Sequence, residues 1–146
     1  MFKQLKEDIQ TIRTRDPAAR SAIEIMLLYN GLKAVRSHRR ANWCSKHGFK
    51  FLARWISQRC VRRTNIEIHP DATIGKRLFI DHGTGVVIGE TTEIGENCTI
   101  YQRRRADCIV ELIMIMQRGT SFCLIDLTGN MTDDFLSRLS GSNVKE

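Results

Sequence analysis

One histidine in this sequence stands among residues suited to proton transfer. The stretch "IDHGTGVVIGET" holds Asp81 and His82, followed by Gly83 and Gly85. A neutral imidazole, with an ordinary pKa of about 6.5, can accept a proton near neutral pH. A histidine beside glycines in a loop has no evident packing role. His82 is therefore the first candidate for general acid–base chemistry.

The residues around this histidine repeat with a period of six. The aliphatic member of each repeat is an isoleucine, at Ile68, Ile74, Ile80, Ile88, Ile94 and Ile100. A six-residue period indicates a parallel β-helix, in which each hexapeptide forms one side of a three-sided coil. The isoleucines point inward and stack on those of the next coil. Residues 66–102 are therefore expected to form about two coils.

The period is interrupted once, beside the histidine. The step from Ile80 to Ile88 is eight residues instead of six. The two extra residues cannot lie flat in the coil, so the chain is expected to bulge outward around "DHGTG", where Gly83 and Gly85 permit unusual backbone angles. The bulge predicts that polar side chains, including that of His82, project away from the coil wall.

The first 65 residues carry helical patterns, so the predicted fold class is α+β. Four short helices in a compact bundle are expected, the third near 32–46 and the fourth near 49–63. Asp16 could cap a second helix that starts at Pro17, and Gly31 would end or kink it. The predicted apolar faces consist of Phe2, Leu5, Ile9 and Ile12 in the first helix, Ile23, Met26, Leu27 and Tyr29 in the second, and Phe51, Leu52, Trp55 and Ile56 in the fourth.

The composition is that of an ordinary globular chain. Its 146 residues are 42% hydrophobic. The N-terminus lacks the apolar core of a signal peptide, and the longest strongly apolar run, Ile109 to Met116, is too short to span a bilayer. A cytoplasmic location without membrane association is therefore expected. The five cysteines are an odd number at scattered spacings, which predicts free thiols.

The charge is unevenly distributed along the chain. Residues 1–65 hold 15 Lys/Arg against 4 Asp/Glu, whereas residues 66–102 hold 2 against 6. A basic half could attract nucleic acid, but it lacks interleaved aromatic residues or a recognised binding motif. The basic residues are better explained as the solvated faces of helices, and nucleic acid is not an expected partner.

Several motifs in this order resemble those of one enzyme family. "DPAARS", "FLARWISQ", "IEIHPDATIGKRLFIDHGTGVVIGETTEIGEN" and "TIYQ" are similar to bacterial serine O-acetyltransferases of the short form, over residues 1–102. The resemblance implies a helical domain at 1–65 and a left-handed parallel β-helix at 66–102, assembled as a homotrimer or a higher oligomer. It also implies transfer of an acetyl group from acetyl-CoA to the L-serine hydroxyl. The product, O-acetylserine, is the precursor of cysteine.

The same resemblance assigns roles to four residues. His82 matches the general base, and Glu67 matches the carboxylate that orients the histidine ring. Asp81 and Asp16 match acidic positions that bind serine, and two carboxylates suit its ammonium group. Glu67 could instead be a surface carboxylate, and Asp16 could be only a helix cap. Acetyl-CoA is the implied co-substrate, and no metal is expected.

The resemblance stops after Gln102. Residues 103–146 show no six-residue period, and the glycine-rich segment and further coils of the family are absent. An irregular tail is expected, with Cys108 to Met116 lying over the open edge of the coil as a short strand or helix, and a short helix near 132–141. A change of reading frame in the gene would explain the abrupt junction. We assign no residue to CoA binding.

Two other functions stay open at this stage. The chain could be an inactive fragment that serves as an oligomerisation or interaction module. Its partner could be the sulfhydrylase of cysteine synthesis, although the C-terminal tail that such a partner grips is not recognisable. A sugar acetyltransferase would share the coil, but it would not be expected to share "DPAA" and "IEIHP" at these distances.

Overall fold

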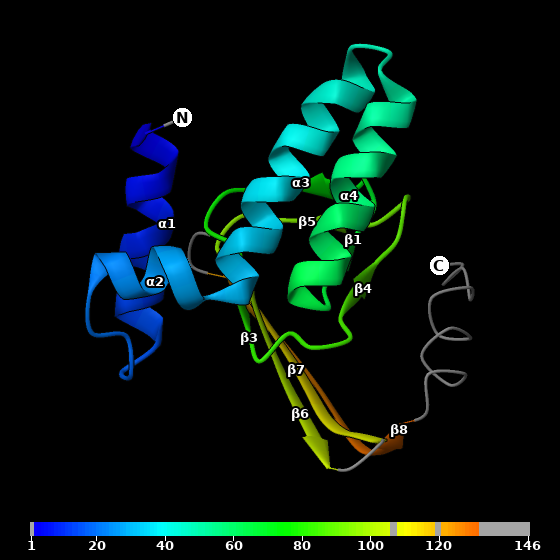
Figure 1. The fold of residues 1–146 in the computed structure, drawn as a ribbon. Coiled ribbons are helices and arrows are strands. Elements are labelled where there is room, and N and C mark those ends of the chain that lie inside the picture. Colours follow the sequence, from blue (N-terminus) through cyan, green and yellow to red (C-terminus); the bar gives the residue numbers. More distant parts are fainter. Residues whose placement is uncertain (1, 106–107, 119–120, 132–146) are drawn as a thin grey trace.

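The computed structural model describes residues 2–105, 108–118 and 121–131, and the side chains of 2–101, Met114 and Ile115. Four helices come first: α1 (Phe2–Arg15), α2 (Ala22–Leu28), α3 (Asn30–Lys46) and α4 (Lys50–Thr64). Eight strands follow: β1 (Glu67–Ile68), β2 (Thr73–Ile74), β3 (Phe79–Asp81), β4 (Val87–Ile88), β5 (Glu93–Ile94), β6 (Thr99–Arg105), β7 (Cys108–Arg118) and β8 (Ser121–Met131). Figure 1 shows α1 and α2 as one pair of helices and α3 and α4 as another, with β6, β7 and β8 running below them.

The strands β1 to β6 form two coils of a three-sided parallel solenoid. Strand β1 pairs with β4, β2 with β5 and β3 with β6, and all three pairs are parallel. Ile68 lies beside Ile88, and Ile80 lies beside Ile100. These registers join residues 20 positions apart, which is three hexapeptides plus the two inserted residues. The predicted six-residue coil and its interruption are therefore confirmed.

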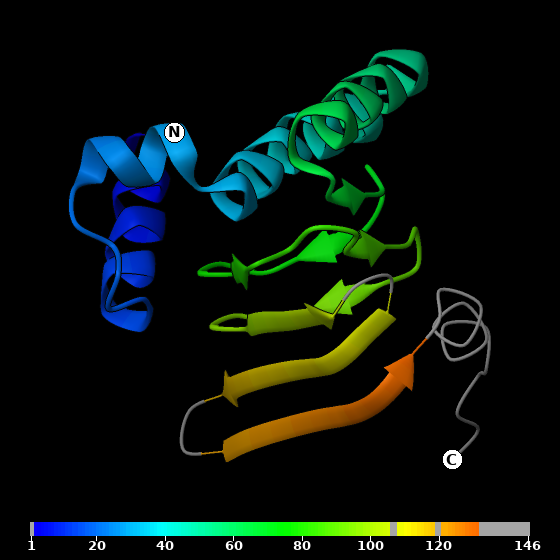
Figure 2. The same ribbon diagram turned by 60° about the horizontal axis from the view of Figure 1, so that its bottom comes forward.

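The coil interior and helix α3 share one hydrophobic core. The stacked isoleucines pack with Cys98 and Leu78, and Ala34 and Val35 of α3 belong to the same cluster. Figure 2 shows α3 and α4 lying over one end of the stacked coils. The helices thus close the end of the solenoid, which would otherwise expose apolar side chains. Cys44, Cys60 and Cys98 are free thiols, as predicted.

The helices do not form the predicted bundle around a core of their own. Ile12 of α1, Ile25 of α2 and Leu32 of α3 pack together with Phe79, which belongs to the coil. In α4 the predicted apolar side is wrong, because Phe51 is 85% exposed and Leu52 and Trp55 are also exposed. The buried residues of α4 are small or polar, namely Ala53, Ser57 and Thr64. None of the described helices is both long and apolar enough to cross a membrane.

The second helix begins later than predicted. Ser21 caps α2, since its hydroxyl accepts a hydrogen bond from the Glu24 amide at 3.1 Å. Asp16 therefore does not cap a helix, and Pro17 lies in the turn before it. The predicted apolar face of this helix is also wrong, because Ile23 and Leu27 face solvent while Ile25 is fully buried.

Gly31 lies within α3 and does not end a helix. A Cβ atom at this position would come within 2.2 Å of the Ile80 carbonyl oxygen. Only glycine allows α3 to approach strand β3 so closely. The glycine was predicted to break a helix, but its role is to let a helix touch the coil.

The predicted irregular tail is wrong for the described residues beyond Gln102, which are all in strands. Strand β6 continues to Arg105, and β7 and β8 add to it in an antiparallel arrangement. Strand β7 covers the free edge of β6, as one of the alternatives for Cys108 to Met116 predicted. Met114 packs against the coil core. The predicted helix near 132–141 lies outside the described residues.

A half-buried arginine, Arg15, joins α1 to the coil through hydrogen bonds. The Arg15 guanidinium donates to the carbonyl oxygens of Arg77, Cys98 and Asn97 at 3.3, 3.0 and 3.2 Å. It also donates to the Thr99 hydroxyl at 2.6 Å. The planar guanidinium can serve several acceptors at once, which a single ammonium group cannot match.

We expect Arg15→Lys to lower the free energy of unfolding by about 2 kcal/mol, because carbonyl groups at the coil corner lose their donors. Urea denaturation followed by circular dichroism measures the change. Arg13→Lys is the matched control, since exposed Arg13 makes only a 3.5 Å contact with the Arg20 carbonyl. Equal effects of the two substitutions would show that the Arg15 contacts do not stabilise the fold.

His38 is a buried histidine in α3. It is 5% exposed, and its Nδ1 atom has no hydrogen-bond partner. Burial, and to a smaller extent the charges of Arg39 and Lys46, lower the pKa of His38 to about 4. Hydrogen bonding to the backbone of His69 and Ala72 opposes this shift in part. His38 is therefore neutral in the folded chain at neutral pH.

We expect the free energy of unfolding to fall as the pH drops from about 6.5 to about 4. In this range His38 is protonated in the unfolded chain but stays neutral in the folded chain. The loss approaches about 3 kcal/mol at pH 4, and above pH 6.5 it vanishes. Unfolding in urea at a series of pH values measures it, and His38→Gln should flatten this slope. Hydrogen bonds from Ser45 and Lys50 lower the pKa of Asp71, so its protonation reduces the stability only at more acidic pH. An unchanged slope in His38→Gln would assign the effect to other groups.

Candidate functional site

His82 follows strand β3 directly and stands at the start of the bulge. Its side chain is 84% exposed. Its φ angle is 48°, a left-handed conformation that is uncommon for residues other than glycine and is often found at functional sites. The Thr84 amide donates to the His82 carbonyl at 2.9 Å, which tightens the turn. The prediction that the bulge presents His82 to solvent is confirmed.

Contacts with the coil hold the rest of the bulge in place. A Cβ at Gly83 would come within 2.6 Å of Ile80 and 2.8 Å of Ile66, so the loop lies directly on the core. The Gly85 amide donates to the Asn65 carbonyl, and φ of Gly85 is 84°. The exposed imidazole therefore belongs to a loop whose backbone is held against the coil at Gly83 and Gly85.

Asp81 is the last residue of β3 and lies beside His82. Its carboxylate oxygen is 3.9 Å from His82 Nε2, which is too long for a hydrogen bond but close enough for attraction to a protonated ring. The Asp81 side chain is 26% exposed. A carboxylate at this place could receive a cationic group of a ligand bound at the imidazole.

Glu67 lies on β1 and pairs with Val87 of β4, the strand that follows the bulge. Its Oε1 atom accepts a hydrogen bond from Gln58 at 3.3 Å and is 4.0 Å from Arg54. No hydrogen bond joins Glu67 to His82 among the described side chains. The carboxylate thus faces α4 in this conformation, and its role as the orienting partner of His82 stays a prediction.

Asp16 is fixed in a turn between α1 and α2. One carboxylate oxygen accepts from the Ala18 amide at 2.8 Å, and the other accepts from the Tyr29 hydroxyl at 2.6 Å. The hydrogen bond to Asp16 raises the pKa of Tyr29 to about 12, with smaller contributions from burial and from the charges of Asp16, Glu24 and Asp81. Asp16 and Asp81, which are far apart in sequence, thus both raise the pKa of the Tyr29 hydroxyl, and Asp16 has the larger effect.

Tyr29 is the residue that sequence reasoning missed at this site. It was assigned only to the apolar face of the second helix, because a tyrosine at helical spacing usually packs in a core. In the structure its ring does pack against a core cluster, but its hydroxyl reaches Asp16. The only available signal was its place 13 residues after Asp16, and a spacing of this kind does not indicate contact unless the fold is known.

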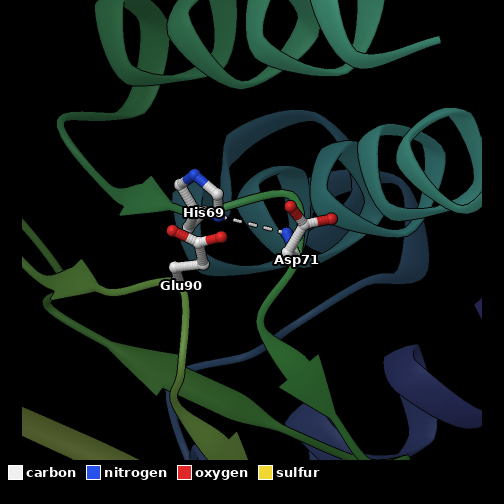
Figure 3. Close-up of side chains that lie close together, drawn as sticks. All are labelled: His69, Asp71 and Glu90. Carbon is white, nitrogen blue, oxygen red and sulfur yellow. Dashed lines mark hydrogen bonds between the residues drawn. The ribbon is translucent and has the colours of Figure 1, made fainter. Parts of the chain in front are cut away.

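A second cluster of polar side chains lies at another corner of the coil. Figure 3 shows His69, Asp71 and Glu90 close together, with ligand atoms within 4.8 Å of one another. The Asp71 amide donates to His69 Nδ1 at 3.2 Å, so a neutral His69 ring carries its proton on Nε2. Neither ring nitrogen then offers a free lone pair to a metal. Lys50, at 3.1 Å, already balances the Asp71 charge.

The fold and the site define a class of α+β proteins in which N-terminal helices close a hexapeptide-repeat solenoid. Residues 1–37 match the family model described as the N-terminal region of serine acetyltransferase. The serine acetyltransferase of Bacillus subtilis (strain 168) is 59% identical over 101 residues, which are 69% of this chain and 46% of that protein. Over the aligned part, the chain belongs to the serine acetyltransferase family.

Solved structures agree with this assignment. Soybean serine acetyltransferase complexed with serine aligns with a TM-score of 0.65 and 37% identity, over 68% of this chain and 41% of that one. Serine acetyltransferase from Brucella abortus strain S19, in complex with coenzyme A, aligns with a TM-score of 0.66 and 37% identity, over 68% and 40%. The chain spans about half the length of the curated relatives it matches.

Proposed function

We propose that the chain is a serine O-acetyltransferase. His82 accepts the proton of the L-serine hydroxyl, and the serine oxygen attacks the thioester carbonyl of acetyl-CoA. The tetrahedral intermediate collapses by breaking the carbon–sulfur bond, and the CoA thiolate takes up the proton from the imidazolium. The products are O-acetylserine and CoA. General base catalysis of this kind contributes roughly 10²–10⁴-fold to a rate.

One observation carries the proposal. The histidine that matches the family's general base is exposed at the tip of an anchored bulge, in a left-handed conformation, beside a carboxylate. A solvent-exposed imidazole held this way has no packing function. Its presence in a chain homologous to serine acetyltransferases supports the role of a base more directly than any other feature.

The other three residues take supporting roles in this proposal. Asp81 and Asp16 bind the ammonium group of L-serine, and Glu67 turns toward the His82 ring when the substrate is bound. Acetyl-CoA is the co-substrate, as the complex of the Brucella abortus relative with coenzyme A supports. The proposal includes a left-handed coil, a cytoplasmic location and a homotrimer, and it assigns no residue to the CoA moiety.

A thiol-release assay tests the proposal. The purified chain is mixed with acetyl-CoA and L-serine, and free CoA is detected with a thiol reagent. Release above the blank is expected with L-serine, but not with a hydroxyl compound that lacks an ammonium group, such as 3-hydroxypropionate or a hexose. A rate equal to the blank with every acceptor would refute the activity. A preference for the hexose would instead indicate a sugar acetyltransferase.

A second candidate function is an oligomerisation or interaction module. The observation that favours it is the set of exposed apolar side chains on the outer faces of α2 and α4. They are Ile23, Leu27, Leu28, Phe51, Leu52 and Trp55. Contiguous exposed apolar side chains commonly mark contact surfaces.

Size-exclusion chromatography with light scattering distinguishes this candidate. A module is expected to co-elute with an intact serine acetyltransferase or with the sulfhydrylase of cysteine synthesis, and to release no thiol in the assay. An active enzyme is expected to form the proposed homotrimer, but it needs no second protein for turnover. A chain that elutes as a monomer and binds neither partner would exclude the module.

A further inference from the structure

The residue between α2 and α3 has a fixed position at the site. Tyr29 ends α2 and precedes α3, with φ of −77° and ψ of 106°. Its amide donates to the Ile25 carbonyl at 3.2 Å, and its own carbonyl accepts from the Lys33 amide at 3.2 Å. Both flanking helices therefore hold the backbone of Tyr29.

The ring of Tyr29 is tied to the strand that carries Asp81. It packs against the cluster that contains Ile25, Leu32 and Phe79, and Phe79 lies two residues before Asp81 on β3. Two residues beyond Tyr29, Gly31 lies in direct contact with the backbone of Ile80. The tyrosine hydroxyl therefore keeps a constant position relative to the end of β3.

The hydroxyl of Tyr29 in turn fixes the Asp16 carboxylate. It donates to one carboxylate oxygen at 2.6 Å, while the Ala18 amide donates to the other at 2.8 Å. Two donors from different directions leave the carboxylate a single orientation. Each oxygen still has a free lone pair, so a cation can also bind.

We propose that Tyr29 is a positioning residue for the amino-acid substrate, which it serves by holding the Asp16 carboxylate in the orientation that binds the substrate ammonium group together with Asp81. This inference rests on the proposed function. Without the tyrosine, Asp16 keeps its charge but loses one of its two constraints, so binding of the ammonium group should weaken. In this role Tyr29 takes no part in proton transfer or acetyl transfer, so chemistry after binding should change little.

Tyr29→Phe tests the proposal because it keeps the ring and removes only the hydroxyl. We expect KM for L-serine to rise on the order of tenfold, as for the loss of a hydrogen bond to a charged group. KM for acetyl-CoA should be unchanged, and kcat should change by no more than about twofold. A merely structural role would instead lower the active fraction without changing KM.

Tyr101→Phe is the matched control. Tyr101 packs against the same cluster, and its ring meets Phe79 edge-on at 6.2 Å. Removal of its hydroxyl should leave KM for L-serine unchanged. The variant also leaves Tyr29 as the sole tyrosine, so its ionisation can be followed by ultraviolet absorbance. Adding Asp16→Asn to Tyr101→Phe should shift this titration to lower pH.

A double-mutant cycle determines whether Tyr29 acts through Asp16. If it does, the double variant Tyr29→Phe with Asp16→Asn has the same L-serine affinity as Asp16→Asn alone. Full additivity would overturn the proposal, and so would an unchanged KM in Tyr29→Phe. If Tyr29→Phe fails to fold, the titration of Tyr29 in the Asp16→Asn background decides, and an unshifted midpoint counts against the proposal. A wild-type chain that neither binds nor acetylates L-serine would refute the proposed function itself, and this inference with it.

Discussion

Replacement of His82 by asparagine is expected to lower kcat for L-serine by roughly 10²–10⁴-fold, the usual contribution of a general base. Asparagine adopts left-handed backbone angles more readily than most residues, so the φ of 48° at this position can be kept. The side chain is 84% exposed, so stability should stay within about 0.5 kcal/mol of the wild type. Thiol release under saturating acetyl-CoA measures the effect.

His47→Asn provides the matched control for this substitution. His47 is also exposed, but it lies directly after the C-terminal end of α3, where its ring stacks on Trp43 with 4.2 Å between the ring centroids. Its replacement should leave kcat and KM unchanged. If both variants kept the wild-type rate, neither histidine would take part in the reaction, and the measured turnover would come from another source.

Gly31→Ala is expected to lower the free energy of unfolding by about 3 kcal/mol, although alanine in a helix normally stabilises by about 1 kcal/mol. The reversal of sign follows from the contact with the coil, because the new methyl group would meet the Ile80 carbonyl oxygen at 2.2 Å. Helix α3 would have to move away from β3, and Tyr29 would move with it. Urea denaturation measures the stability, and KM for L-serine should rise in the same variant.

Gly89→Ala is the control, since its Cβ would meet only the Thr92 hydroxyl, at 3.8 Å, and φ of Gly89 is not positive. This substitution should change the free energy of unfolding by less than about 1 kcal/mol. Stabilisation by Gly31→Ala would mean that α3 does not lie against β3 as closely as the structure shows.

The coil could be predicted because its signal is periodic and local. Each isoleucine occupies the same place in its hexapeptide, so the spacing alone gives the register that joins Ile68 to Ile88 and Ile80 to Ile100. The two extra residues before Ile88 could be placed only in a bulge. The exposure of His82 then followed, because a side chain on a bulge leaves the wall of the coil.

The environment of Asp16 could not be predicted in the same way. An aspartate before a proline usually caps a helix, and the local pattern offered nothing against that interpretation. The Tyr29 hydroxyl reaches Asp16 only because α1, α2 and α3 pack together against Phe79 of the coil. Contacts between residues far apart in sequence depend on how whole elements dock, and no spacing rule encodes them.

The sequence alone determined the period of the coil, the place of its interruption and the exposed histidine there, because these depend on neighbours along the chain. Only the tertiary structure decided which helix face is buried. Helix α4 packs through Ala53 and Ser57, whose hydroxyl donates to the Ile68 carbonyl, and turns Phe51 outward. Small residues permit close approach of the helix to the coil. An apolar stripe shows that a face is suited to contact, but only packing shows which partner it contacts.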